Sequence, residues 1–283
     1  MADESIIYHL LILEDKCTDI FFEIASIPFE IKGQTEISIH SSMQPFIVEN
    51  EEMVDVKYNV VCESNMKVIK EKSIYADEVY KIDLCQIEEG KEYDLCIPEK
   101  MLLNKKLFEG SNIWNFLAFE FPLLEKQAFI LHSSFVSWKG NGILFTAPSG
   151  TGKSTQADLW EKYEAADIYN GDRTIVRKMN GEYYGFGSPY AGTSGIYRNE
   201  SAPIKAIVVI EQGPENIIQR LYGREAFLPL FRETLMNTWN KEYMEKMTDL
   251  LMDAACQIPV YHLSCRPDQD AVNTVKNEIL KEL

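Results

Sequence analysis

The feature that most constrains the fold is a glycine-rich run placed between a predicted strand and a predicted helix. The run covers Ala147–Ser154 and follows the apolar residues Ile143–Thr146 directly. It matches the consensus G-x-x-x-x-G-K-[ST] at every position except the first, where alanine replaces glycine. From Lys153 to about Tyr163 the apolar spacing is that of a helix. A strand that enters such a loop and continues into a helix indicates an α/β layer structure.

The centre of this run is suited to bind phosphate groups. Small residues there allow successive backbone N–H groups to turn inward, and the following helix adds its positive N-terminal end. Lys153 can reach the β- and γ-phosphates of a nucleoside triphosphate, and the Ser154 hydroxyl can ligate Mg²⁺. We therefore expect ATP and Mg²⁺ as cofactors, although a chance match in a turn before a helix remains the alternative. The expected nucleotide-binding residues are Ser149, Gly150, Thr151, Gly152, Lys153, Ser154 and Thr155.

The apolar pattern divides the chain into three parts. Residues 1–97 alternate apolar and polar side chains, for example at 54–60, which predicts a β-rich N-terminal domain of unknown role. Residues 98–127 change to helical spacing and are expected to connect the two halves. Residues 128–283 hold the glycine-rich run among alternating strands and helices, and we expect them to form a nucleotide-binding domain. Its last helices are predicted at about 224–238, 241–256 and 267–282.

The charge of the chain excludes some partners. Its 44 acidic residues exceed its 28 lysines and arginines, which gives a formal charge of −16. Such a charge repels nucleic acid and anionic membrane surfaces, so neither is expected as a partner. The sequence begins without a secretory signal and has no apolar run of about 18 residues. A cytoplasmic protein without a membrane span is expected.

Two further motifs surround the glycine-rich run. Leu131–Ser134 places a histidine, His132, on a strand before the hairpin turn Gly140–Gly142, and Asn170–Arg173 follows the helix. With the glycine-rich run, these motifs resemble the catalytic domain of the HPr kinase/phosphorylase family, whose phosphate loop is related to that of phosphoenolpyruvate carboxykinase. The resemblance covers residues 129–283 and is closest to a divergent branch of that family. It implies a kinase fold, ATP with Mg²⁺, and a homo-oligomer.

The resemblance also suggests which residues act. Asp172 matches the second, catalytic aspartate of the family, whereas Gly171 stands where the family has its first aspartate. Asp172 is expected either to accept the proton of an acceptor hydroxyl or to ligate Mg²⁺ together with Ser154. The family has a histidine at the same distance from its loop, which implies a role for His132 near the phosphates or the acceptor. The alternatives are a turn residue for Asp172 and a packed strand residue for His132.

Two arginines are candidates for neutralising the transferred charge. Arg173 and Arg198 carry guanidinium groups that can bind phosphate oxygens in a bidentate manner, although a surface role is the alternative for both. The glycine-rich stretch 185–195 near them is expected to be a mobile loop over an acceptor or a wide connection between strands.

Three functions are compatible with these residues. The favoured one is an ATP-dependent kinase that phosphorylates a hydroxyl, either a serine of a peptide or protein or a small molecule. A nucleotide-binding regulator or maturation protein without turnover is the alternative, and the missing aspartate at Gly171 supports it. A phosphoenolpyruvate carboxykinase-like lyase is the third, but it needs more histidine, lysine and arginine ligands than four histidines suggest.

Overall fold

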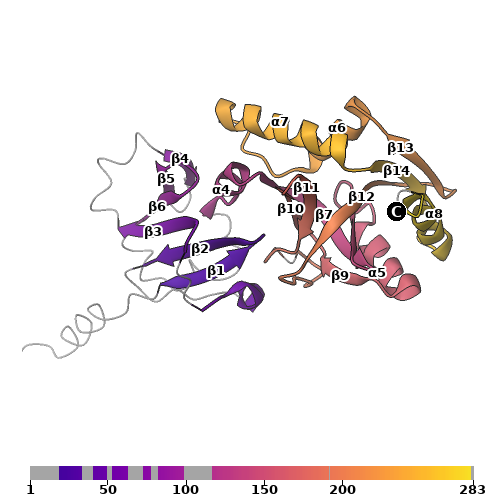
Figure 1. The fold of residues 1–283 in the computed structure, drawn as a ribbon, viewed down its shortest axis with the longest axis horizontal. Helices are drawn as coiled ribbons and strands as arrows, with labels where there is room; N and C mark the ends of the chain where they lie inside the picture. Colours follow the sequence, from indigo (N-terminus) through magenta and orange to yellow (C-terminus); the bar gives the residue numbers. More distant parts are fainter. Residues whose placement is uncertain are drawn as a thin grey trace, which may run out of the picture. The chain divides into compact units, whose positions relative to one another are not determined.

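The structure is a computed structural model that describes residues 19–33, 41–49, 53–62, 73–77, 82–98, 117–190 and 192–281. It divides into two compact units, Met1–Pro122 and Leu123–Leu283. Figure 1 shows their elements. The chain is a mixed α/β protein with two sheets, so the predicted fold class is confirmed at this level. Most of the predicted connection at 98–127 lies outside the described residues.

The first unit is built on a sheet of six strands in the order β1-β2-β3-β6-β5-β4. The pairs β2–β3 and β3–β6 are parallel, and the other neighbours are antiparallel. Its core is aromatic: Phe22 and Phe29 stack with ring centroids 5.1 Å apart, and the ring of Phe119 meets both edge-on. The elements are β1 (Ile20–Ile24), β2 (Ile27–Lys32), a 3₁₀ helix η1 (Ser41–Phe46), β3 (Val56–Cys62), β4 (Ser73–Asp77), β5 (Ile82–Glu88) and β6 (Glu92–Ile97).

The second unit begins within the short helix α4 (Glu120–Glu125) and places its longer helices beside a sheet. None of the helices in the described part of the chain is long and apolar enough to cross a membrane. The other elements are β7 (Ala128–Trp138), β8 (Asn141–Thr146), α5 (Lys153–Glu164), β9 (Asp167–Asn170), β10 (Arg173–Met179), β11 (Glu182–Phe186), β12 (Ser201–Gln212), β13 (Ile217–Leu221), α6 (Arg224–Glu233), α7 (Lys241–Gln257), β14 (Val260–Cys265) and α8 (Gln269–Ile279).

The strand order in this unit is β11-β10-β7-β8-β12-β14-β13. Strand β9 also pairs with β7, and β11 also pairs with β12. The neighbours β8, β12 and β14 run parallel to one another. Their carboxyl ends therefore share one edge of the sheet, where the loops that follow these strands meet. Ligands of α/β proteins commonly bind at such an edge.

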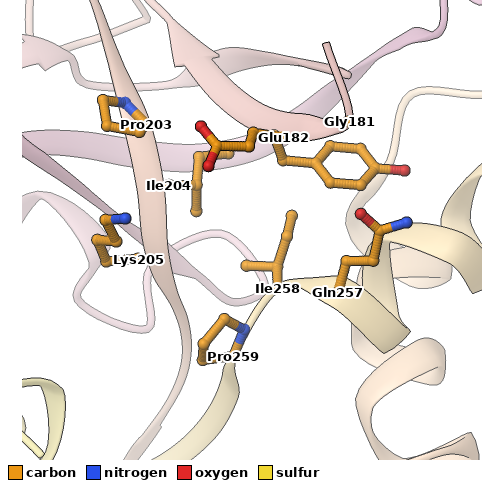
Figure 2. Close-up of a pocket in the computed structure, with 9 residues that line it drawn as sticks. Gly181, Glu182, Pro203, Ile204, Lys205, Gln257, Ile258 and Pro259 are labelled. Carbon is orange, nitrogen blue, oxygen red and sulfur yellow. The ribbon is translucent and has the colours of Figure 1, made fainter. Parts of the chain in front are cut away.

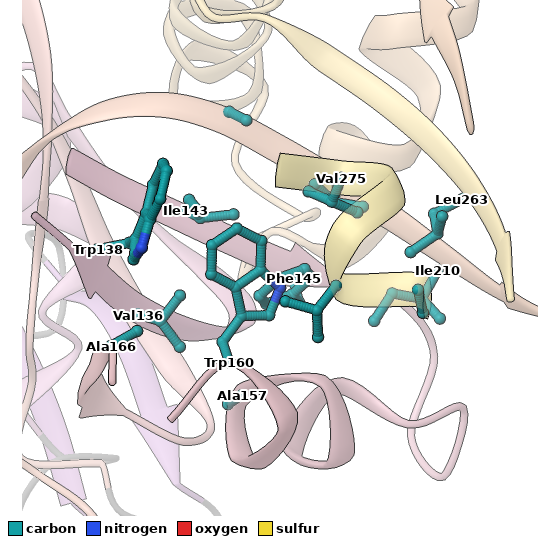
Figure 3. Close-up of a cluster of buried hydrophobic side chains, with 14 of the residues drawn as sticks. Val136, Trp138, Ile143, Phe145, Ala157, Trp160, Ala166, Ile210, Leu263 and Val275 are labelled. Atoms are coloured by element: carbon teal, nitrogen blue, oxygen red, sulfur yellow. The ribbon is translucent and has the colours of Figure 1, made fainter. Parts of the chain in front are cut away.

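Strand β8 is buried on both faces, as expected for a strand within a layered α/β sheet. Ile143 and Phe145 point to a core that they share with Trp160 of α5 and Val275 of α8 (Figure 3). The indole of Trp160 is fully buried, meets Trp138 edge-on at 5.7 Å and lies 6.2 Å from the ring of Phe145. This cluster fixes α5, and hence the glycine-rich run at its start, against the sheet.

Three features of this unit differ from the sequence prediction. Helix α6 ends at Glu233 rather than near 238, because Thr234 leaves the helix in an extended conformation and bridges to Leu131 of β7. Strands β9, β11, β13 and β14 were not predicted. The stretch 185–195 is not one loop, since Gly185 and Phe186 belong to β11. Residue 191 of that stretch lies outside the described residues.

Helix α7 is joined to strands β10 and β11 by a half-buried carboxylate. Asp253 accepts hydrogen bonds from Lys178 Nζ and Tyr183 Oη, each 2.7 Å from Oδ2, and from Gln257 Nε2 at 2.7 Å from Oδ1. Burial acts to raise the pKa of Asp253, but the hydrogen bonds from these three side chains outweigh it and lower the pKa. The ionised carboxylate therefore stabilises the folded state.

We expect Asp253→Asn to lower the free energy of unfolding by about 1 kcal/mol at neutral pH, a size reduced because the carboxylate is partly exposed. Because the folded pKa is lowered, this stabilisation is present above the unfolded pKa of about 4 and is lost as the pH falls through the folded pKa. Urea denaturation at pH 7 and at about pH 3 measures the difference. The control is Asp249→Asn, one turn earlier on α7 and exposed. An equal loss in both variants would contradict the assignment.

Candidate functional site

The loop after β8 has the backbone geometry that its glycines allow. Gly150 and Gly152 have φ values of +81° and +120°, which side chains other than glycine rarely adopt. The backbone N–H of Thr151 donates to the carbonyl of Pro148 at 3.3 Å and closes the turn. Gly152 caps α5 without a side-chain hydrogen bond. N–H groups of the first helical turn thus remain available to an anion.

Lys153 is the most buried charged residue of this loop, with 7% of its surface exposed. Its Nζ donates to the carbonyl of Ala147 at 2.8 Å and to that of Pro148 at 3.4 Å, so the side chain folds back over the loop. Burial lowers the pKa of Lys153, while the carboxylates of Glu233 and Asp172 act in the opposite direction. The Ser134 hydroxyl also donates to the carbonyl of Lys153 at 2.9 Å, which holds the start of α5 beside the strand that carries His132.

The pairing of β7 with β10 brings His132, Asp172 and Arg173 together. His132 lies opposite Arg173 in the antiparallel ladder, and the carbonyl of Asp172 accepts a hydrogen bond from the N–H of Ser133 at 2.9 Å. His132 Nε2 is 3.6 Å from Asp172 Oδ1, and Arg173 Nε is 3.9 Å from Asp172 Oδ2. Each of these side chains is about one-third exposed. Residues selected from two separate motifs thus form one group.

Asn170 fixes the turn that carries Asp172. Its Oδ1 accepts hydrogen bonds from the N–H groups of Asp172 and Arg173, both at 2.8 Å. Its Nδ2 donates to the carbonyls of Ser188 and Tyr190 at 2.9 and 3.1 Å. The side chain of Asn170 is fully buried. It therefore ties the turn to the segment after β11, and sequence reasoning gave this residue no such role.

The absence of a side chain at Gly171 has a steric cause. A Cβ atom built there would lie 2.0 Å from Ser194 Oγ and 2.5 Å from its Cβ. Gly192 approaches the site in the same way, because its Cβ position would be 2.7 Å from the Asp172 carboxyl carbon. Residues 192–195 therefore lie against the turn that holds Asp172, and Ser194 occupies the space that an aspartate at 171 would need.

Glu233 is the member of the site that sequence reasoning missed. Its Oε2 is 3.0 Å from His132 Nδ1, and 15% of its side chain is exposed. The contact exists because Thr234 bridges to Leu131, and the N–H of Leu235 donates to the carbonyl of Ile130 at 2.9 Å. Nothing in its local sequence distinguishes Glu233 from other acidic residues, since its partner is 101 positions away.

A pocket of about 420 Å³ lies beside the glycine-rich loop. It opens at the carboxyl ends of β12 and β14, and Gln212 Nε2 donates across it to the carbonyl of Thr151 at 3.2 Å. Its volume lies within the range of small-molecule sites. The lining residues are Thr151, Gly152, Thr155, Gln156, Ile210, Gln212, Gly213, Cys265, Arg266 and Pro267.

A second pocket, of about 270 Å³, lies at the start of β12 rather than at its end (Figure 2). Ile204 and Ile258 form an apolar wall, and Lys205, Glu182 and Gln257 add polar groups. None of the predicted site residues lines it. The sequence prediction therefore points to the first pocket and to the group around Asp172.

The remaining predicted residues lie in different surroundings. Ser154 and Thr155 are exposed in the first turn of α5. Ser149 is exposed in the loop. Arg198 makes an ion pair with Asp167 at 3.3 Å, so its recorded partner lies outside the group around Asp172. Its predicted role in neutralising charge stays a prediction.

The side-chain oxygen atoms near the glycine-rich loop fit a metal ion that binds together with a nucleotide. Among the described residues, no three His, Cys, Asp or Glu side chains are arranged to hold a metal ion. Mg²⁺ usually binds one or two protein oxygens together with phosphate oxygens and water. The exposed Ser154 hydroxyl and the partly exposed Asp172 carboxylate are groups of this kind.

Comparisons with known proteins give matches among solved structures and a match to one family model. The HPr(Ser) kinase/phosphatase from Coxiella burnetii shares 11% identity and covers 54% of this chain and 92% of its own, with a TM-score of 0.33. A similarity of that size does not establish a shared fold or function. No curated protein matches the chain. A family model described as SynChlorMet cassette protein ScmC matches residues 112–273, which is more than half of the sequence. The chain therefore belongs to the SynChlorMet cassette protein ScmC family.

Proposed function

We propose that this protein is an ATP-dependent and Mg²⁺-dependent kinase that transfers the γ-phosphate to a hydroxyl group. The observation that carries the proposal is that two neighbouring residues of β7 hold Lys153 and Asp172: the Ser134 hydroxyl donates to the Lys153 carbonyl and the Ser133 N–H to the Asp172 carbonyl, both at 2.9 Å. Phosphoryl transfer needs a held triphosphate and a group that receives the proton of the acceptor. The two residues supply these two needs at one place.

The loop and the adjacent pocket can hold the nucleotide between them. In the proposed complex, N–H groups of residues 150–154 bind the phosphates, and Lys153 leaves the carbonyls of Ala147 and Pro148 for the β- and γ-phosphates. The pocket of about 420 Å³ then receives the nucleoside, because it begins at Thr151 and Gly152 and extends away from the loop. Gln212 and Gln156 offer amide groups to a base there.

The acceptor hydroxyl is proposed to bind at Asp172. The Asp172 carboxylate accepts the hydroxyl proton while the acceptor oxygen bonds to the γ-phosphorus and the bond to the β-phosphate oxygen breaks, which releases ADP. Arg173 offers its guanidinium group to the transferred charge; at present it lies over the ring of Tyr190 at 4.8 Å. Mg²⁺, held by Ser154 or Asp172, would neutralise charge on the phosphates.

One observation favours a second candidate, a nucleotide-binding regulator or maturation protein without turnover. Ser194 occupies the side-chain space at Gly171, so the site offers one carboxylate fewer than the family pattern that the sequence resembles. A site without an aspartate at position 171 can still bind a nucleotide. The two candidates differ in whether phosphate leaves ATP, and this difference can be measured directly.

The test is incubation with γ-labelled ATP and Mg²⁺ in the presence of pooled hydroxyl compounds and peptides. We expect labelled product from the wild-type protein, and about 10²- to 10⁴-fold less from Asp172→Asn, because the amide cannot accept the proton. Asp158→Asn, an exposed position on α5, is the matched control and should keep full activity. Nucleotide binding without labelled product from any protein would favour the regulator, and equal activity in both variants would remove Asp172 from the mechanism.

A further inference from the structure

The contact between Glu233 and His132 fixes the tautomer of the neutral imidazole ring. A carboxylate has only acceptor atoms, so the Oε2 of Glu233, 3.0 Å from Nδ1, requires the proton of the neutral ring to be on Nδ1. Nε2 then carries the lone pair, and it faces Asp172 Oδ1 at 3.6 Å. In its neutral form the ring therefore offers Asp172 an acceptor rather than a donor.

The position of Glu233 in its helix adds to this argument. It is the last residue of α6, where the carbonyl groups make the helix end negative and a carboxylate is unfavourable. The exit of the chain at Thr234 is nevertheless pinned to β7 by the bridge to Leu131, which holds Glu233 beside His132. The Glu233 carboxylate is mostly buried and points at the imidazole of His132. The contact with His132 explains this placement better than helix stability does.

We propose that Glu233 is a positioning residue that holds His132 with Nε2 turned toward Asp172. The inference rests on the proposed kinase function. When Asp172 has taken the proton of the acceptor hydroxyl, its carboxyl group becomes a donor, and Nε2 of His132 is the acceptor that faces it. The hydrogen bond stabilises the protonated product of the transfer step. Glu233 itself touches neither nucleotide nor acceptor.

The first experiment reads the ring directly and needs no activity. Long-range ¹H–¹⁵N spectra of the full protein with ¹⁵N-labelled histidine identify which ring nitrogen carries the proton. The variant His132→Gln assigns the signals among the four histidines. We expect a protonated Nδ1 in the wild-type protein and in Glu233→Gln, which keeps an acceptor oxygen, and a shift of the proton toward Nε2 in Glu233→Leu. An unchanged ring in Glu233→Leu would overturn the proposal.

The second experiment separates positioning from binding. In Glu233→Leu we expect kcat to fall about 10- to 100-fold, by analogy with the loss seen when the hydrogen-bond partner of a metal-binding histidine is removed, with the KM for ATP changed less than about twofold. Glu233→Gln should recover part of the loss. Glu225→Leu, exposed in the first turn of the same helix, is the control and should behave as wild type. A rise in KM with unchanged kcat would overturn the proposal.

The two experiments distinguish failure of this inference from failure of the proposed function. If no phosphate transfer occurs in any protein, the spectra still decide whether Glu233 sets the ring of His132. If transfer occurs but the ring and kcat do not respond to Glu233→Leu, the kinase proposal stands and the positioning role is excluded.

Discussion

Replacing Lys153 with methionine is expected to lower kcat/KM for ATP by about 100-fold or more, which corresponds to about 3 kcal/mol of transition-state stabilisation. The ammonium is the cation that the loop offers to the phosphates, and methionine is an unbranched side chain one atom shorter that carries no charge. Burial lowers the pKa of Lys153, so the charged form carries a free-energy cost in the folded protein. The variant should therefore fold at least as well as the wild type, and the loss should be confined to nucleotide chemistry.

Steady-state ADP formation measures the change in kcat/KM, and equilibrium dialysis measures the change in ATP binding. The matched control is Lys162→Met, since Lys162 is exposed near the other end of α5 and should leave both values unchanged. Thermal unfolding of each variant verifies that the fold is intact. Phosphate transfer in Lys153→Met above about one-tenth of the wild-type rate would show that the loop does not hold the triphosphate in the proposed way.

The sequence predicts the part of the site that depends on local geometry. The glycines at 150 and 152 have the positive φ values that the loop motif requires, and Lys153 starts the helix where the apolar spacing places it. His132 and Asp172 were selected from two separate motifs, and the pairing of β7 with β10 brings them together. Local patterns of this kind are visible in a sequence because each depends on residues a few positions apart.

The rest of the site depends on contacts that the sequence does not reveal. Glu233 reaches His132 because Thr234 pairs with Leu131, and this tertiary contact ends α6 five positions before its predicted end. The contact between Ser194 and the side-chain position at Gly171 also depends on the tertiary structure. The sequence alone does not show that Ser194 fills this space. Strand β13 was missed because it is short and has no buried residue, so its apolar pattern is weak.

The packing that holds the loop in place leads to the second large expected effect, in Trp160→Ala. The indole of Trp160 is fully buried between Trp138, Phe145 and helix α8 (Figure 3), so alanine leaves a cavity that these rigid neighbours cannot fill. We expect the free energy of unfolding to fall by about 3–5 kcal/mol, a large share of the 5–15 kcal/mol that is usual for a protein. Urea denaturation followed by circular dichroism measures it.

Two further variants make this expectation specific. In the described structure the indole Nε1 of Trp160 has no hydrogen-bond partner. Trp160→Phe therefore removes a buried unpaired N–H together with part of the ring. We expect it to lower the free energy of unfolding by less than half as much as Trp160→Ala does. Trp239→Ala changes an exposed tryptophan and should shift stability by less than about 0.5 kcal/mol. An equal loss in Trp160→Ala and Trp239→Ala would mean that α5 is not fixed to the sheet by this cluster. The glycine-rich loop would then lack the rigid support on which phosphate binding at Lys153 depends.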